Sequence, residues 1–282
     1  MTIRLANADG RATLLVGDGV VDVERASGGR FPAEPMGAMA HWDALAEWAA
    51  DLDDSAADGP IDLSVLGPPV PRPGKIFAVG LNYATHARES GMAVPAQPSV
   101  FTKFPTCLVG PTADVVLPSA FCDWEVELVA VVGRGGRRIA EHEALDHVAG
   151  YCIGQDISER RVQMAGNPPQ FSMGKSFDTF GPTGPAIVSL DAFADPLDVG
   201  LWCDVSGERV QDGRTRDLIF NVPALVAYLS GICTLEAGDL IFTGTPDGVG
   251  TARTPPRYLR EGDTIVSAIE GAGTLTNLCT RV

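Results

Sequence analysis

A ten-residue stretch, DWEVELVAVV at residues 123–132, carries the strongest signal in this sequence. Its acidic and apolar side chains alternate before the run becomes wholly apolar, which predicts a β-strand that enters the protein core. One face of that strand would carry Asp123, Glu125 and Glu127. Three carboxylates on one half-buried face repel one another, so the pattern indicates a cation between them. A strand edge exposed to water is the other interpretation, and the stretch alone leaves both open.

A divalent metal ion is the simplest cation for such a face. Because the available ligands are all carboxylate oxygens, they favour Mg²⁺ or Mn²⁺ over zinc. Asp156 offers a further carboxylate after a strand predicted at residues 148–153. The spacing of Asp156 and Glu159 also fits a capping box at the start of a helix, which would give the Asp156 side chain a purely structural role.

Two residues upstream are candidates for catalysis. A strand predicted at residues 75–80 leads into a short helix that Asn82 would cap and that Gly91 would end. His86 and Glu89 are three residues apart on this helix and therefore share a face. They would form either a surface ion pair or a catalytic pair in which Glu89 orients His86 as a general base.

Length, charge and composition narrow the class of protein. The 282 residues suffice for one large domain, or for one large and one small domain. With 21 basic and 36 acidic residues the net charge is −15, which argues against nucleic acid or an anionic membrane as a partner. The six cysteines form no C-x-x-C pair, so a zinc site or a disulfide framework is not expected. No signal peptide or membrane span is evident, and we expect a cytoplasmic protein.

The order of predicted elements favours a β-rich α+β fold. Short strands are expected within residues 1–24 and a helix over residues 37–52. The proline-rich stretch at residues 67–74 cannot form a regular element and suits a linker. We therefore predict a small N-terminal domain at residues 1–70 and a catalytic domain at residues 71–282. Many short strands, few helices and no βαβ rhythm argue against a doubly wound sheet.

Several segments, taken in order, resemble the fumarylacetoacetate hydrolase family. They are GLNYATHARE at 80–89, DWEVEL at 123–128, AGY at 149–151, DISER at 156–160, GKSF at 174–177, GDLI at 238–241 and GTPDGVG at 244–250. The resemblance implies a mixed β-sandwich roll with a small N-terminal domain, usually a homodimer. One departure is visible, because Glu159-Arg160-Arg161 stands where the family often has Ala-Arg-Asp. The more basic local charge would alter substrate choice.

The resemblance also implies roles for individual residues. It assigns metal binding to Glu125, Glu127 and Asp156, catalysis to His86, Glu89 and Lys175, and substrate binding to Arg160, Gln163 and Thr245. We further expect Tyr83, with the segments at residues 90–98 and 165–172, to line the side of the substrate pocket that lies farther from the metal.

The resemblance implies a metal-dependent enzyme acting on 2-oxo acids in the catabolism of aromatic compounds. In the expected reaction an acylpyruvate, which is a 2,4-dioxo acid, is cleaved at a carbon–carbon bond through a metal-bound pyruvate enolate. The acylpyruvases and the 2-hydroxyhepta-2,4-diene-1,7-dioate isomerases are the relevant branch. The same site could instead decarboxylate oxaloacetate or isomerise a 2-hydroxy-diene dioate. A non-catalytic binder of 2-oxo acids is the other class, but a binder needs no general base.

Overall fold

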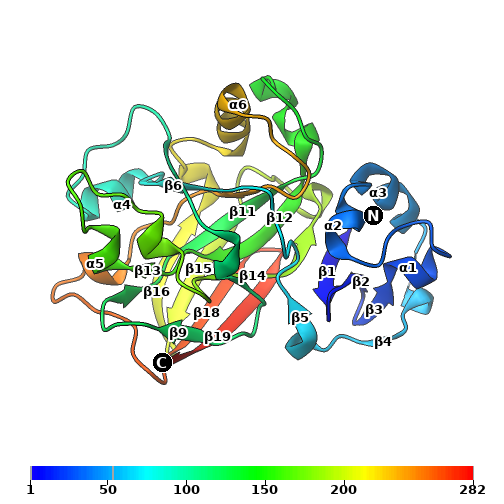
Figure 1. Ribbon diagram of the computed structural model, residues 1–282, viewed down its shortest axis with the longest axis horizontal. Helices are drawn as coiled ribbons and strands as arrows, with labels where there is room; N and C mark the ends of the chain where they lie inside the picture. The colour runs from blue at the N-terminus through cyan, green and yellow to red at the C-terminus, as the bar shows by residue number, and fades with distance from the viewer. Residues whose placement is uncertain (1, 53, 282) are drawn as a thin grey trace.

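The computed structural model describes residues 2–52 and 54–281, and strands dominate it (Figure 1). The strands are β1 Arg4–Ala8, β2 Arg11–Val16, β3 Gly19–Asp22, β4 Gly59–Pro60, β5 Leu66–Gly67, β6 Ile76–Gly80, β7 Ser99–Thr102, β8 Leu108–Val109, β9 Val115–Leu117, β10 Cys122–Asp123, β11 Val126–Val132, β12 Val148–Gln155, β13 Ser158–Glu159, β14 Gly181–Val188, β15 Gly200–Val205, β16 Glu208–Arg214, β17 Leu240–Phe242, β18 Thr264–Ile269 and β19 Gly273–Arg281. The α-helices are α1 Val23–Ala26, α2 Pro35–Met39, α3 Trp42–Ala49, α4 Ala84–Glu89, α5 Arg160–Gln163 and α6 Val222–Ile232.

Two sheets enclose the main core. The larger sheet runs in the order β4-β3-β2-β1-β14-β12-β11-β17-β6-β7, and the smaller one in the order β16-β15-β18-β19-β9. Strand β12 contacts β18, and β11 contacts β15, so the sheets pack against each other (Figure 1). Residues Val126–Val132 of β11 are buried on both faces, which explains why the second half of this strand is continuously apolar.

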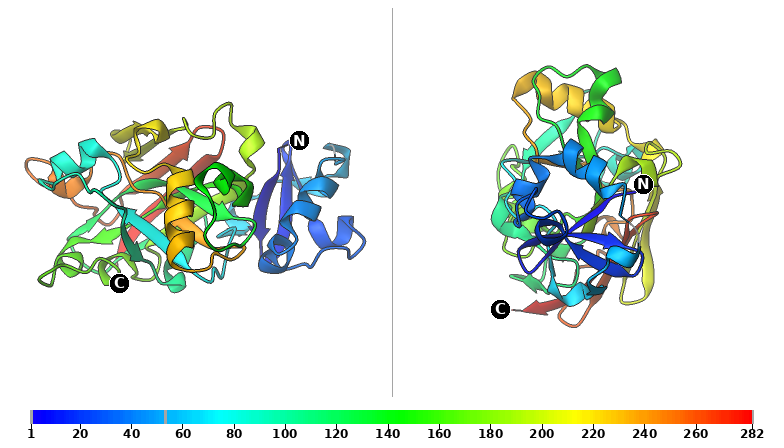
Figure 2. Two further views of the ribbon diagram at one scale, coloured as in Figure 1. Left: turned by 90° about the horizontal axis from the view of Figure 1, so that it is seen from above. Right: turned by 90° about the vertical axis from the view of Figure 1, so that its right-hand side faces the viewer.

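The N-terminal residues form their own cluster of strands and helices at one end of the molecule (Figures 1 and 2). Strands β1, β2 and β3 confirm the short strands expected within residues 1–24. The single helix predicted over residues 37–52 is wrong, because the chain forms α2 and α3 with a break between them. His41 leaves helical geometry at φ −114°, and this break lets Met39 and Trp42 both enter the core. Strand β1 pairs with β14, which joins this cluster to the larger sheet.

The strand predicted at residues 123–132 is interrupted near its start. Residues Cys122–Asp123 form β10, which pairs with β13, whereas β11 begins only at Val126 and pairs with β12. Between them, the Glu125 backbone N–H donates to the side chain of Gln155 at 2.9 Å instead of to a backbone carbonyl of a neighbouring strand. Asp123 therefore belongs to a different strand pair from Glu127, and the three acidic residues do not lie on one continuous strand.

No helix in residues 2–52 and 54–281 is long and apolar enough to cross a membrane.

Candidate active site

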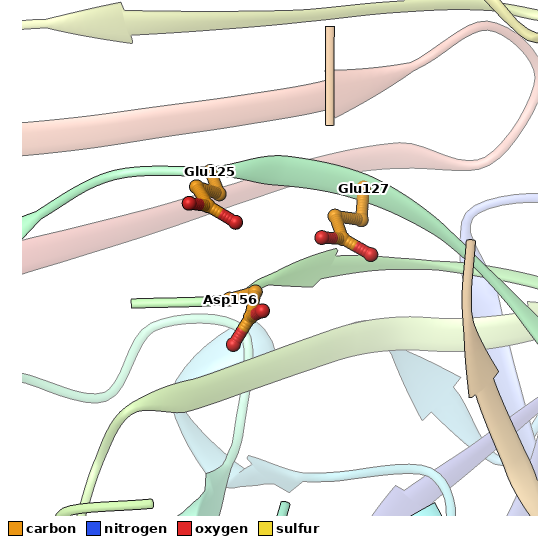
Figure 3. A group of neighbouring side chains, drawn as sticks. All are labelled: Glu125, Glu127 and Asp156. Carbon is orange, nitrogen blue, oxygen red and sulfur yellow. The ribbon is translucent and has the colours of Figure 1, made fainter. Parts of the chain in front are cut away.

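Three carboxylates meet where β11 begins and β12 ends. Single oxygen atoms from Glu125, Glu127 and Asp156 all lie within 4.8 Å of one another. Figure 3 shows the side chains of Glu125 and Glu127 pointing toward that of Asp156. The antiparallel register brings them together, because Val126 faces Gln155 across the two strands. All three residues are buried, so an exposed strand edge does not explain this pattern.

The charges around this cluster are unevenly balanced. Burial alone would raise the pKa of Glu125, but the Lys175 ammonium and the Arg160 guanidinium lower it to about 2. Burial raises the pKa of Glu127 well above its ordinary value, and the charges of Asp156 and Glu125 add to this effect. A divalent cation would favour the ionised form of Glu127. The buried oxygen-only donor set therefore fits Mg²⁺ or Mn²⁺.

Two buried lysines bind carboxylate oxygens of Glu125 and Asp156. The Lys175 Nζ atom lies 2.7 Å from Glu125 Oε2 and 2.6 Å from Asp156 Oδ2. The Lys103 Nζ atom lies 2.8 Å from Asp156 Oδ1 and also donates to the carbonyl oxygens of Lys175 and Phe180. Asp156 is thus fixed by an ammonium group on each of its oxygens.

Sequence reasoning missed Lys103, although a signal for it exists. Residues Ser99–Thr102 form β7, and Phe101 is buried between two exposed neighbours. Alternation along the strand places Lys103 on the same inward face as Phe101. A lysine at such a position needs buried carboxylates as partners, and Asp156 supplies one.

The predicted pair on α4 is present and faces the same cavity as the acidic cluster. The Nδ1 atom of His86 lies 2.8 Å from Glu89 Oε1, and Glu89 Oε2 accepts the backbone N–H of Gly248 at 2.9 Å. His86 is buried, so this is not a solvated surface pair. The N-terminal cap predicted for Asn82 is wrong. Tyr83 occupies the cap position, whereas the Asn82 side chain bonds to backbone groups of Phe220 and Thr243.

Arg160 and Gln163 lie on α5 and contact the acidic cluster from its other side. The Arg160 Nη1 atom donates to Glu125 at 2.7 Å and to Gln163 Oε1 at 2.9 Å. Its Nε atom donates to Asp123 at 2.8 Å. The helix cap here is Glu159, whose side chain accepts the backbone N–H of Val162. Asp156 therefore does not form the alternative capping box.

Thr245 and Tyr83 occupy different environments. Thr245 lines the cavity, and its hydroxyl donates to the Val126 carbonyl at 2.9 Å and accepts from Gln211 at 2.7 Å. Tyr83 is 2% exposed and does not line this cavity. Burial raises the pKa of Tyr83, and the negative charges of Glu127 and Asp217 add to this effect.

The cavity formed by these elements has a volume of about 280 Å³. All of the predicted site residues line it except Tyr83 and Asp156. The Asp156 carboxylate pairs instead with Lys175, which does line the cavity. The cavity therefore brings carboxylates of the acidic cluster, an ammonium group and an imidazole–carboxylate pair into one small space. A larger cavity of about 630 Å³ lies apart from this chemistry, between β1, β2 and the end of α3.

Residues 75–280 match the family model described as fumarylacetoacetate (FAA) hydrolase C-terminal. The chain belongs to the fumarylacetoacetate hydrolase family. The matched range includes the acidic cluster, both buried lysines and the His86–Glu89 pair, so the family relationship covers the whole candidate site.

Similar members of the fumarylacetoacetate hydrolase family are enzymes. The human mitochondrial oxaloacetate tautomerase FAHD2A is 45% identical over 211 residues, which are 74% of this chain and 67% of that protein. A Mycobacterium smegmatis protein assigned to HpcE is 48% identical, and its crystal structure gives a TM-score of 0.95 over 99% of each chain. The maleylpyruvate hydrolase of Sphingobium sp. SYK-6, in complex with manganese(II) and pyruvate, is 30% identical with a TM-score of 0.82 over 99% of each chain.

These likenesses confirm the predicted β-rich fold of the fumarylacetoacetate hydrolase family. The manganese(II) ion in the Sphingobium enzyme and the acidic cluster of this chain together support a divalent metal ion as the cofactor.

Proposed function

We propose that this protein is a divalent-metal-dependent hydrolase that cleaves a carbon–carbon bond in acylpyruvates. The observation that carries the proposal is the His86–Glu89 pair, which lines the same small cavity as the acidic cluster and Lys175. A site that only bound 2-oxo acids would not need a buried imidazole oriented by a carboxylate. The same proposal includes a homodimer, a cytoplasmic location and a place in aromatic catabolism.

Glu125, Glu127 and Asp156 would hold Mg²⁺ or Mn²⁺ in this site. When bound, the ion supplies a Lewis acid for the oxygen atoms of a 2-oxo acid. Lys103 and Lys175 keep Asp156 in place through both of its oxygens. Arg160 keeps Glu125 and Gln163 in place.

The hydrogen bonds around His86 support its proposed role as a general base. An ionised carboxylate can only accept, so the Nδ1 atom of His86 donates to Glu89. This leaves Nε2 as the proton acceptor toward a water molecule in the cavity. Glu89 is itself held by the backbone N–H of Gly248, so the imidazole is fixed in one orientation.

The bond changes follow from this arrangement. His86 takes a proton from water, and the hydroxide adds to the acyl carbonyl of the substrate. The bond between that carbonyl carbon and C3 then breaks, releasing a carboxylic acid and the enolate of pyruvate. The enolate gains a proton to give pyruvate. The Lys175 ammonium, which contacts Glu125 and Asp156, would stabilise the developing negative charge.

A second candidate is a reaction of oxaloacetate, and the 45% identity to human oxaloacetate tautomerase favours it. Tautomerisation or decarboxylation of oxaloacetate also develops enolate charge, as would isomerisation of a 2-hydroxy-diene dioate. Those reactions would use Lys175 and the acidic cluster without an attacking water.

An ultraviolet assay distinguishes the two candidates. The purified protein with Mg²⁺ is given acetylpyruvate or oxaloacetate, with EDTA as the control, and loss of the enol absorbance and formation of pyruvate are followed. Metal-dependent release of pyruvate and acetate from acetylpyruvate is expected. His86→Ala should lower that rate by about 10²-fold or more while metal binding is retained. Action on oxaloacetate alone, or wild-type hydrolysis by the variant, would contradict the hydrolase proposal.

A further inference from the structure

We infer that the site takes 2-oxo acids whose chain carries no second carboxylate beyond C4. This inference rests on the proposed use of the site for 2-oxo acids, and it concerns the far end of the substrate. It would distinguish this chain from the maleylpyruvate hydrolase to which it is similar, because maleylpyruvate has a carboxylate at each end.

Both permanent positive charges among the described residues that line the cavity are already paired. Arg160 donates to Asp123 through Nε and to Glu125 through Nη1, while its buried Nη2 atom makes no hydrogen bond and lies 2.7 Å from Asp123 as part of the ion pair. Asp123 is fully buried and also accepts the backbone N–H groups of Gly250 and Thr251. Asp123 is therefore fixed, and it holds the charge of Arg160 whatever happens at Glu125.

Lys175 is similarly paired with carboxylates at the acidic end of the cavity. Its ammonium group lies between Glu125 and Asp156, and its side chain is 2% exposed. Any substrate oxygen that Lys175 contacts therefore belongs to the end near the metal ligands. His86 pairs with Glu89, and in the proposed function it transfers a proton.

Arginines close to the cavity point elsewhere. The Arg161 guanidinium stacks over the ring of Phe121 at 3.5 Å, and Arg161 does not line the cavity. This explains why the basic residue beside Arg160 does not add charge to the pocket. Arg253 pairs with Glu208 at 2.9 Å. Arg88 is exposed on α4 and is not a lining residue either.

The remaining wall of the cavity is largely apolar. Phe101 and Phe171 pack edge to face with their centroids 5.6 Å apart, and Met92, Met164 and Val249 also line the space. A carboxylate placed against these groups would lose water without gaining a counter-charge. Such a carboxylate would also share the small cavity with the acidic side chains of Glu89, Glu125 and Glu127. A volume of about 280 Å³ suits a short acyl chain.

A matched pair of six-carbon acids tests the inference by binding alone. 2-Oxohexanoate and 2-oxoadipate share the 2-oxo acid end and differ only in a terminal methyl or carboxylate group. Calorimetric titration of the Mn²⁺-loaded protein should give a Kd at least about tenfold lower for 2-oxohexanoate. Equal affinities, or tighter binding of 2-oxoadipate, would overturn the inference. Failure of both acids to bind would overturn it as well, because the site would not take 2-oxo acids.

Two variants locate the effect. Met164 is 47% exposed at the cavity, so Met164→Lys should introduce a cation there and lower the Kd of 2-oxoadipate by about tenfold, with circular dichroism to check folding. Arg161→Ala should leave the ratio of the two Kd values unchanged, and a changed ratio would mean that Arg161 reaches the ligand. The binding ratio needs no turnover, so it remains informative even if acetylpyruvate is not cleaved and the proposed hydrolysis fails.

Discussion

Lys103 is the residue whose removal should affect the folded state most directly. Its fully buried ammonium group meets the buried carboxylate of Asp156 and two backbone carbonyl oxygens. Lys103→Met removes the donor to Asp156 Oδ1 and to the Lys175 carbonyl, whereas the Phe180 carbonyl still accepts the backbone N–H of Ile157. Breaking a buried pair in this way costs about 3–5 kcal/mol. We expect urea unfolding to show a loss of that size.

Arg134→Met is the matched control for that measurement. Arg134 pairs with Asp43 on the surface, where both side chains are more than half exposed. Such a pair contributes about 0–1 kcal/mol. If the two variants lose similar stability, the buried contacts of Lys103 do not hold the site together.

Glu127 should make the stability of the metal-free protein fall as the pH rises. Burial, Asp156 and Glu125 all raise the pKa of Glu127 above its ordinary value of 4.5. Above about pH 4.5 the unfolded chain therefore binds fewer protons than the folded one, and stability declines until the folded pKa is passed. In EDTA, the Tm of the wild-type protein should decrease with pH relative to that of Glu127→Gln. Parallel Tm curves for the two proteins would contradict this origin of the pH dependence.

At the level of single residues, short-range patterns predicted four of the side chains that line the cavity, and the family resemblance supplied Lys175, Arg160, Gln163 and Thr245. Alternation along one predicted strand indicated Glu125 and Glu127, and helical spacing indicated the pair His86 and Glu89. Lys103 was missed because its partner Asp156 lies 53 positions away. The prediction for Tyr83 concerned a pocket wall, but the structure buries this side chain outside the cavity.

At the scale of elements, local cap signals were the weakest guide. Asn82 precedes a helix, as a cap should, yet its side chain bonds to Phe220 and Thr243, which lie far away in the sequence. Long-range partners that bury the amide completely outweigh one local hydrogen bond. The break between α2 and α3 has a similar cause, because burial of both Met39 and Trp42 outweighs the continuity of one helix.

Asn82→Ala tests how strongly this amide connects α4 to the rest of the fold. The side chain makes three hydrogen bonds, to the backbone N–H and carbonyl of Phe220 and to the carbonyl of Thr243. Leaving these buried groups unpaired should cost about 3 kcal/mol or more in urea unfolding. The control is Asn221→Ala, which removes the cap of α6 and should cost about 1 kcal/mol. A loss for Asn82→Ala no larger than that of its control would contradict the connecting role.

At the scale of the whole molecule, the sequence predicted the class of fold but not its long-range strand pairings. Many short strands without a βαβ rhythm indicated a β-rich protein, and two packed sheets confirm it. The pairing of β1 with β14 joins segments more than 170 residues apart, and no local pattern encodes such a partner. The boundary near residue 70 stays a prediction.

Metal binding should stabilise the entire fold, because the predicted ligands and their partners come from distant parts of the chain. Glu125 and Glu127 lie at the start of β11, Asp156 follows β12, and the lysines that hold Asp156 come from the end of β7 and from Met173–Lys175. At about 100 times its Kd, a ligand that binds only the folded state adds about 2.7 kcal/mol. For a protein of this size that corresponds to a rise in Tm of roughly 5–10 °C. Differential scanning fluorimetry with Mn²⁺, and with EDTA as the reference, measures this rise in Tm.

Asp156→Asn should lose most of the rise in Tm. Asp204→Asn, which alters an acidic side chain paired with Arg209, should keep it. An undiminished rise in Asp156→Asn would place the ion outside the acidic cluster.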